Sequence, residues 1–499
     1  MNTTAPAPSA ALQPVANKDR IQVMDLLRGF ALIGIIFMNI EWFNRPISDL
    51  MAFDFSQTGG DWAASWLVKV FIEGKFYKLF SLLFGMGFAV MLLNAQQADR
   101  PFGAWFSRRM FALFLFGMVH MIFLWGGDIL HDYAVAGMLL LGFVFLLRTN
   151  KLSKYNSPTA YAKTGFTIML VPIVLSLGAA IFFGVTRDNA AVVEEGEQRV
   201  MVRQQSDEMI EAFKLTPEFL NSHLADNALP ADESTEPEEE IDEDQMTTEE
   251  QIAHRVQQRF DRHKEKEIML HKEAHLFSQA DYWQVTQYRF EKGIEQLAST
   301  PMMAFVVCLP LFMIGYWLVA SGRLTEPQRH KAFFNAVCWG GLGIGLVLNV
   351  VSVYIILNPI TKQSLELTAI SYNLFFYSQI ILCFGYFGMF VKLASKQWFI
   401  RSFSWLAPLG KMALTNYISH SIILTSIFYG YAGGMFGKVD RAEQIALAIV
   451  ILFCQVVICK IWLKYFRFGP LEWLWRSITY LQWQPILRRE QSSERLQTA

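Results

Sequence analysis

The stretch MDLLRGFALIGIIFMNI at residues 24–40 is almost wholly apolar, and Lys18 and Arg20 precede it. About twenty consecutive apolar residues cross the hydrocarbon core of a bilayer as a helix. No small-residue cleavage pattern follows, so we expect the stretch to remain as a first transmembrane helix rather than to be removed as a signal peptide. It therefore predicts that the chain is embedded in a membrane.

The composition of the 499 residues agrees with this prediction. Hydrophobic residues make up 53% of the chain and charged residues 17%, whereas a soluble domain has about 25% charged residues. We predict an all-α, polytopic membrane protein with about ten transmembrane helices. The expected spans are roughly 23–42, 76–94, 109–125, 127–147, 165–185, 301–320, 333–356, 370–391, 408–430 and 443–463. A shorter apolar stretch at 61–73 is expected to form an interfacial or re-entrant helix.

Charges are segregated along the chain. Residues 187–300 hold 27 acidic and 12 basic residues, and the remainder holds 17 acidic and 31 basic residues. This pattern predicts a basic membrane body that carries one acidic insert. Within the insert, residues 226–250 contain twelve acidic residues and no basic one, which is typical of disorder. Residues 249–298 are expected to form one long polar helix.

Lysine and arginine also predict the orientation. The loops expected on one side of the membrane hold 23 of them, and the short loops on the other side hold six. The positive-inside rule then places both termini in the cytoplasm and the insert outside. The expected domains are a flexible cytoplasmic tail at 1–20, a five-helix half at 21–186, the periplasmic insert at 187–300, a second five-helix half at 301–465 and a cytoplasmic tail at 466–499.

Polar residues inside the expected spans are the candidates for function, because ionisable side chains are costly in a bilayer. The candidates in the outer half of the membrane are Asn39, His120, Asp128, Asn416 and His420. As a histidine, His120 could act as a general base with Asp128 orienting it. The structural alternative for these residues is hydrogen bonding between helices. No metal site is expected.

A second cluster is expected at the cytoplasmic face, where an anionic cofactor would enter. It comprises Arg28, Arg108, Arg109 and Lys411. The structural alternatives are an ion pair between Asp25 and Arg28 and a Lys411 side chain that reaches to the interface.

Several stretches together resemble a known family. They are MDLLRGFALIGIIFMNI, GKFYKLFSLLFGMGFAVM, GMVHMIFLWGGDILHDYAVAGMLL, GKMALTNYISHSII and FGPLEWLWRSITY. The resemblance is to the YeiB-like proteins of the bacterial inner membrane, which share a C-terminal membrane domain of unknown function. More distantly, the sequence is similar to the transmembrane acyltransferases, which move acyl groups from a cytoplasmic thioester to an outer acceptor. In one branch an arginine precedes a catalytic histidine by eleven positions. Arg28 matches that arginine, but Asn39 stands where the histidine would be, so His120 or Asp128 would have to supply the base.

The resemblance implies a membrane acyltransferase in the bacterial inner membrane. It would use acyl-CoA as a co-substrate, with no permanently bound cofactor, and a glycan or another envelope molecule as acceptor. Two alternatives stay open: a transporter or exporter of a small anionic or amphiphilic solute, and a non-enzymatic envelope factor whose acidic insert binds a basic periplasmic partner. The bilayer is an expected partner, and nucleic acid is not, because no basic patch is interleaved with aromatic residues.

Overall fold

The structure is a computed structural model that describes residues 22–49, 57–186, 189–213, 215–224, 246–358 and 365–488. Across these ranges every regular element is helical, apart from an isolated β-bridge between Phe466 and Leu487. In the same ranges nine helices are long and apolar enough to cross a membrane. The predicted all-α, polytopic fold is therefore confirmed.

The first half of the chain is built of helices, one of which is interrupted. Its elements are α1 (Gln22–Phe43), η2 (Ile47–Asp49), α2 (Gly59–Leu67), η3 (Val68–Ile72), α3 (Phe76–Gln97), α4 (Gly103–Phe123), α5 (Leu130–Arg148), η4 (Ser153–Tyr155) and α6 (Pro158–Thr186). The stretch expected to lie at the interface forms α2 and η3, and η3 is a π-helix. A turn at Gly74, where φ is +78°, then leads into α3. Glycine suits this backbone because it has no Cβ to clash.

The second half contains α11 (Leu309–Ala320), α12 (Lys331–Leu357), α13 (Leu365–Ala394), α14 (Gln397–Ser402), α15 (Leu406–Lys411), α16 (Ala413–Phe428), α17 (Arg441–Tyr465) and α18 (Pro470–Tyr480). The span expected at 408–430 is divided into α15 and α16. The break is stabilised by Glu472 of α18, whose Oε1 accepts hydrogen bonds from the backbone N–H groups of Leu414 and Thr415 at 2.7 and 3.1 Å. This division leaves α16 shorter than a full span.

The acidic insert is largely helical where it is described. It contains α7 (Asn189–Phe213), α8 (Pro217–Ser222), α9 (Thr248–Gln279) and α10 (Tyr282–Met302), and the π-helical η6 (Met303–Cys308) leads into α11. The single helix expected over 249–298 is two helices, because the carboxylate of Asp281 caps a new one. Most of the acidic run at 226–250 lies outside the described residues.

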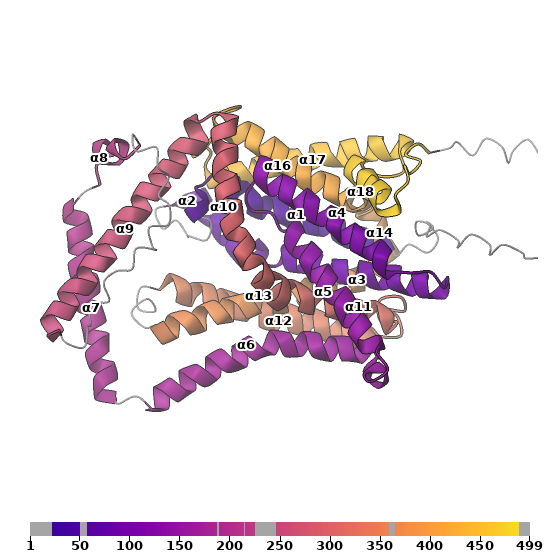
Figure 1. Ribbon diagram of the computed structural model, residues 1–499, viewed down its shortest axis with the longest axis horizontal. Helices are drawn as coiled ribbons and strands as arrows, with labels where there is room; N and C mark the ends of the chain where they lie inside the picture. Colours follow the sequence, from indigo (N-terminus) through magenta and orange to yellow (C-terminus); the bar gives the residue numbers. More distant parts are fainter. Residues whose placement is uncertain are drawn as a thin grey trace, which may run out of the picture.

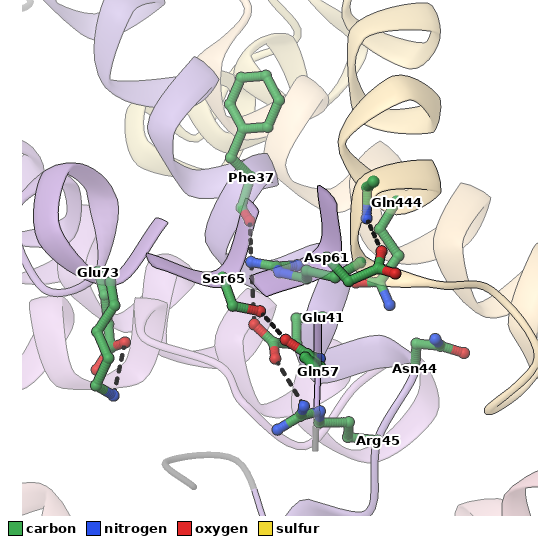
Figure 2. Close-up of polar contacts among 12 residues, drawn as sticks. Phe37, Glu41, Asn44, Arg45, Gln57, Asp61, Ser65, Glu73 and Gln444 are labelled. Carbon is green, nitrogen blue, oxygen red and sulfur yellow. Dashed lines mark hydrogen bonds and ion pairs between the residues drawn. The ribbon is translucent and has the colours of Figure 1, made fainter. Parts of the chain in front are cut away.

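The insert helices extend from one end of the helical bundle, and α18 lies at the opposite end (Figure 1). We call these the insert end and the tail end. At the insert end, the carboxylate of Glu273 on α9 accepts hydrogen bonds from the backbone and hydroxyl of Ser48. Buried Arg441, at the start of α17, forms an ion pair of 3.0 Å with Glu41 on α1, and Glu41 also pairs with Arg45 (Figure 2). These contacts fix the end of α1.

Glycines allow the closest helix crossings in the membrane body. A Cβ at Gly29 of α1 would overlap the backbone oxygen of Leu406, and one at Gly410 of α15 would overlap that of Asp25. Small residues of this kind let helices approach closely where lipid provides no hydrophobic driving force. The crossing therefore brings the start of α1, at Asp25 and Gly29, against α15.

We expect Gly29→Ala to destabilise the protein by about 1–3 kcal/mol, because the added methyl group must push the two backbones apart. Gly142→Ala is the matched control, since a Cβ at Gly142 meets nothing within 4 Å. Thermal unfolding of both variants in nanodiscs would check this. Equal unfolding temperatures for the two variants would contradict the close crossing.

Candidate functional site

His120 lies near the end of α4 and makes two hydrogen bonds outside its own helix. Its Nδ1 is 2.8 Å from Oδ1 of Asp128, and its Nε2 is 2.7 Å from Oγ of Ser421. A carboxylate only accepts hydrogen bonds, so Nδ1 donates to Asp128, and Nε2 of the neutral ring accepts the hydroxyl proton of Ser421. All three side chains are buried. The order of hydroxyl, imidazole and carboxylate is that of the triads that perform acyl transfer.

Asp128 stands in the turn between α4 and α5. Its Oδ2 accepts hydrogen bonds from the backbone N–H and the ring Nδ1 of His131, at 3.1 and 2.9 Å. Burial disfavours the charged carboxylate, but the hydrogen bonds from His120 and His131 outweigh burial and hold the pKa of Asp128 below its ordinary value. Gly117 permits this approach, because a Cβ there would lie 2.7 Å from Oδ2 of Asp128. Asp128 is therefore ionised at neutral pH.

Two faces of α16 contact different helices, α4 and α17. Tyr417 and Ser421 are four residues apart and share one face, and the Tyr417 ring centroid is 5.1 Å from that of His120. Asn416 and His420 share the adjacent face and contact α17. His420 Nε2 is 2.8 Å from Oε1 of Gln455, and Asn416 hydrogen-bonds to the thiol of Cys459.

Of the predicted outer residues, the structure brings His120 and Asp128 together and places Asn416 and His420 against α17. Asn39 is buried on α1, and no hydrogen bond joins it to the other four among the described residues. The sequence analysis did not single out Ser421. Its spacing of four from Tyr417 indicates a shared face, but only the structure shows that His120 of α4 lies on that face.

A cavity of about 370 Å³ leads from the tail end towards this triad. It follows α3 from Ala95 to Phe80, which is about 22 Å along a helix. Its inner part is lined by apolar side chains that include Leu83, Leu113 and Leu414, and its closed end is lined by Ile129 and Tyr417. His120 and Ser421 do not line the cavity, but the ring of Tyr417, which does, packs against that of His120.

The mouth of the cavity is basic. Arg28, Arg109 and Lys411 of the predicted cationic cluster line it, and so do Arg100 and Arg476, which the sequence analysis did not single out. The two carboxylates among the lining residues are Asp25, 3.2 Å from Arg28, and Glu472. Five cations and two carboxylates leave an excess of positive charge, so the mouth is suited to an anionic group.

Aromatic packing fixes one of these cations. The guanidinium of Arg109 lies 3.5 Å from the centroid of the Trp475 ring, and the indole N–H of Trp475 donates to the backbone oxygen of Arg109. Arg108, the fourth predicted cation, does not line the cavity and instead donates to the backbone oxygen of Thr479 at 3.3 Å. Burial raises the pKa of Glu472 above its ordinary value, because the charged form loses solvation there. In the described part of the chain no three His, Cys, Asp or Glu side chains are grouped to hold a metal ion.

These features define a class: a polytopic helical membrane protein with an amphiphilic cavity and a buried Ser–His–Asp arrangement next to Tyr417, one of the lining residues. The family described as "Protein of unknown function (DUF418)" matches residues 318–482. The chain is 30% identical over 489 residues to the uncharacterized protein YxaH of Bacillus subtilis (strain 168), and the match covers 96% of this chain and 99% of that protein.

Other relatives also match over nearly their whole length. The uncharacterized protein YeiB of Escherichia coli (strain K12) is 24% identical over 477 residues, which is 92% of this chain and 96% of that protein. An uncharacterized 39.9 kDa protein of Bacillus acidopullulyticus is 24% identical over 484 residues, which is 96% and 100% of the two chains. No solved structure is significantly similar. The chain belongs to the DUF418 family, and the resemblance to the YeiB-like proteins is confirmed.

We expect Asp128→Asn to lower the free energy of unfolding by roughly 3 kcal/mol at pH 7, because an amide cannot replace a buried carboxylate that pairs with two histidines. Asp99→Asn, at an exposed loop residue, is the control. The folded pKa of Asp128 is lowered, so its stabilisation is complete above about pH 4, the unfolded value, and is lost as the pH falls through the folded value. Thermal unfolding across pH would measure this; equal stability of wild type and Asp128→Asn at pH 7 would contradict it.

Proposed function

We propose that the chain transfers an acyl group from an acyl-CoA to a hydroxyl or amine acceptor, in the bacterial inner membrane and with the tail end in the cytoplasm. One observation carries this proposal: Asp128, His120 and Ser421 are linked by hydrogen bonds of 2.8 and 2.7 Å, and His120 packs against Tyr417, which lines the cavity. The orientation rests on the distribution of lysine and arginine. The acceptor would be an envelope glycan or a small molecule that arrives from the insert end.

The cavity would hold the donor in two parts. Arginine forms bidentate hydrogen bonds to phosphate, so Arg28, Arg100, Arg109 and Arg476 would bind the phosphates at the mouth. The apolar interior would take the pantetheine arm and the acyl chain, since small-molecule sites are concave and mostly apolar. The thioester reaches Ser421 only when the Tyr417 side chain turns aside, because Tyr417 lines the closed end.

The chemistry would follow the hydrogen bonds of the triad. His120 Nε2 takes the proton of Ser421 as Oγ attacks the thioester carbon, and Asp128 stabilises the imidazolium that forms. The C–S bond breaks, the thiol leaves with the proton from His120, and the acyl group becomes an ester on Ser421. The acceptor then gives its proton to His120 and attacks this ester. Ser421 leaves with that proton, which restores the starting state.

Asn416 and His420 would act as positioning residues in this scheme. Their hydrogen bonds to Cys459 and Gln455 fix the rotation of α16 about its axis. That rotation determines whether the next face, with Tyr417 and Ser421, points at His120. Among the described residues, no hydrogen bond of Asn39 assigns it a step.

Binding tests the donor site. We expect saturable binding of acetyl-CoA or a longer acyl-CoA to the full chain in nanodiscs, weakened at least tenfold by Arg28→Ala or Arg109→Ala and retained in His120→Ala. Arg329→Ala, an exposed arginine outside the cavity, is the matched control. No saturable binding of either donor to the wild type would reject the proposal.

Turnover tests the triad separately from binding. We expect release of free thiol from bound acyl-CoA to fall about 10³-fold or more in Ser421→Ala, as for the loss of a triad nucleophile. Ser426→Ala is the control, because Ser426 is an exposed serine on the same helix. If Ser421→Ala keeps the wild-type rate, His120 acts directly on the acceptor and no acyl-serine forms.

A second candidate is a carrier for an anionic amphiphile. It is favoured by two interruptions in the membrane body, at Gly74 and at Met412, because secondary transporters often bind solutes where spanning helices are broken. Uptake of a fatty acyl anion into proteoliposomes, without thiol release, would favour the carrier over the transferase.

A further inference from the structure

A second polar cluster lies at the turn between η3 and α3, apart from the cavity. Lys69 of η3, Lys75 of the turn and Lys78 of α3 are all buried, with Lys75 and Lys78 fully enclosed at 0% exposure. None of the three lines the cavity. Lys69 forms an ion pair of 3.3 Å with Glu73. In Figure 2, Glu73 lies apart from the ion pair between Glu41 and Arg45. Among the described residues, Glu73 is the carboxylate that pairs with this group of lysines.

Where the hairpin of α12 and α13 is described, the partners that it supplies are neutral amides. Lys75 Nζ donates to the backbone oxygen of Lys69 at 2.8 Å and to Oδ1 of Asn349 at 3.3 Å. Lys78 Nζ donates to Oε1 of Gln379 at 2.5 Å. Asn349 is held in turn by Ser378, to which its amide donates at 2.9 Å.

The two lysines belong to one connected arrangement. Ser378 and Gln379 are neighbours on α13, so the partners of Lys75 and Lys78 are tied together. A Cβ at Gly74 would overlap the side-chain amide of Gln379, so glycine lets the turn lie against α13 without displacing that amide. The ammonium of Lys75 is 5.5 Å from the Phe375 ring centroid, and that of Lys78 is 4.4 Å from the Phe376 ring centroid.

These partners do not satisfy two charged lysines. In its protonated form each lysine has three N–H donors, and acceptors within the described ranges take two of those of Lys75 and one of those of Lys78. Cation–π contacts offset part of the cost. An unbalanced charge in a bilayer is nevertheless expensive, and such groups mark ion or substrate sites.

We propose that Lys75 and Lys78 bind an oxyanion, a phosphate or carboxylate group, at the break between η3 and α3. Its oxygens accept the remaining N–H groups and balance the positive charge. Lys75 also stands at the N-terminus of α3, where the helix dipole favours an anion. The oxyanion comes either from a free solute or from the headgroup of an anionic lipid. This site is separate from the triad and does not depend on acyl transfer.

Stability measurements on the full chain test the site, because a ligand that binds only the folded state raises the unfolding temperature. Inorganic phosphate and acetate are titrated, at constant ionic strength, into nanodiscs of phosphatidylcholine. Nanodiscs that contain phosphatidylglycerol are measured in parallel without added anion. A saturable rise with phosphate or acetate identifies a free oxyanion, and a rise only with phosphatidylglycerol identifies the lipid headgroup.

Variants locate the effect. We expect Lys75→Met and Lys78→Met to weaken the apparent affinity at least tenfold, whereas Lys438→Met, an exposed lysine at the insert end, leaves it unchanged. Asn349→Asp places a carboxylate beside Lys75 and is expected to remove the response while keeping the fold, which covers the case in which the methionine variants do not fold. The proposal is overturned if the wild type responds to none of the three probes, or if the response persists undiminished in Asn349→Asp.

Discussion

The two hydrogen bonds of His120 join three separate pieces of the membrane body. On one side the ring is hydrogen-bonded to Asp128, in the turn before α5, and on the other side to Ser421 of α16. In an interior without water, an imidazole left unpaired on either nitrogen costs free energy, and an unpaired Asp128 carboxylate costs more. The register of α4 against α16 and the shape of the following turn are therefore set together. The same constraint gives the site its chemical character, because a carboxylate at Nδ1 leaves Nε2 as a base directed at a hydroxyl.

The breaks in the helices follow from the same requirement that buried polar groups find partners. At the start of α16, Glu472 provides acceptors for the backbone N–H groups that the interruption leaves open. At the start of α3, lysines and the amides of α12 and α13 surround the turn at Gly74. The first break borders the cavity and is satisfied by a carboxylate within the chain. The second encloses Lys75 and Lys78 with neutral partners among the described residues, which is why we propose an external anion there.

Sequence alone predicted the membrane class, the all-α fold and most spans, because long apolar runs depend on transfer free energy and on little else. Prediction from the sequence failed where contacts between distant helices determine the local structure. The length and overall hydropathy of residues 408–430 predict one span, but Glu472 from a distant helix stabilises a break at Met412. The polar residues of α16 were recognised as a group, yet their division into a Ser421 face and a His420 face depends on what α4 and α17 present. Lys75 and Lys78 were not singled out as candidates, because nothing in their local sequence reveals that α12 and α13 enclose them.

The central claim is that Ser421 is a nucleophile activated by His120 and reached through the cavity. Labelling with an alkyl fluorophosphonate, followed by mass spectrometry of the labelled peptides, tests it most directly, since the apolar chain of the probe suits the cavity and its phosphorus reacts with activated serines. The account predicts one labelled site, Ser421, with labelling lost in His120→Ala and blocked by excess acyl-CoA. An unlabelled Ser421 in a folded protein that binds acyl-CoA would contradict it.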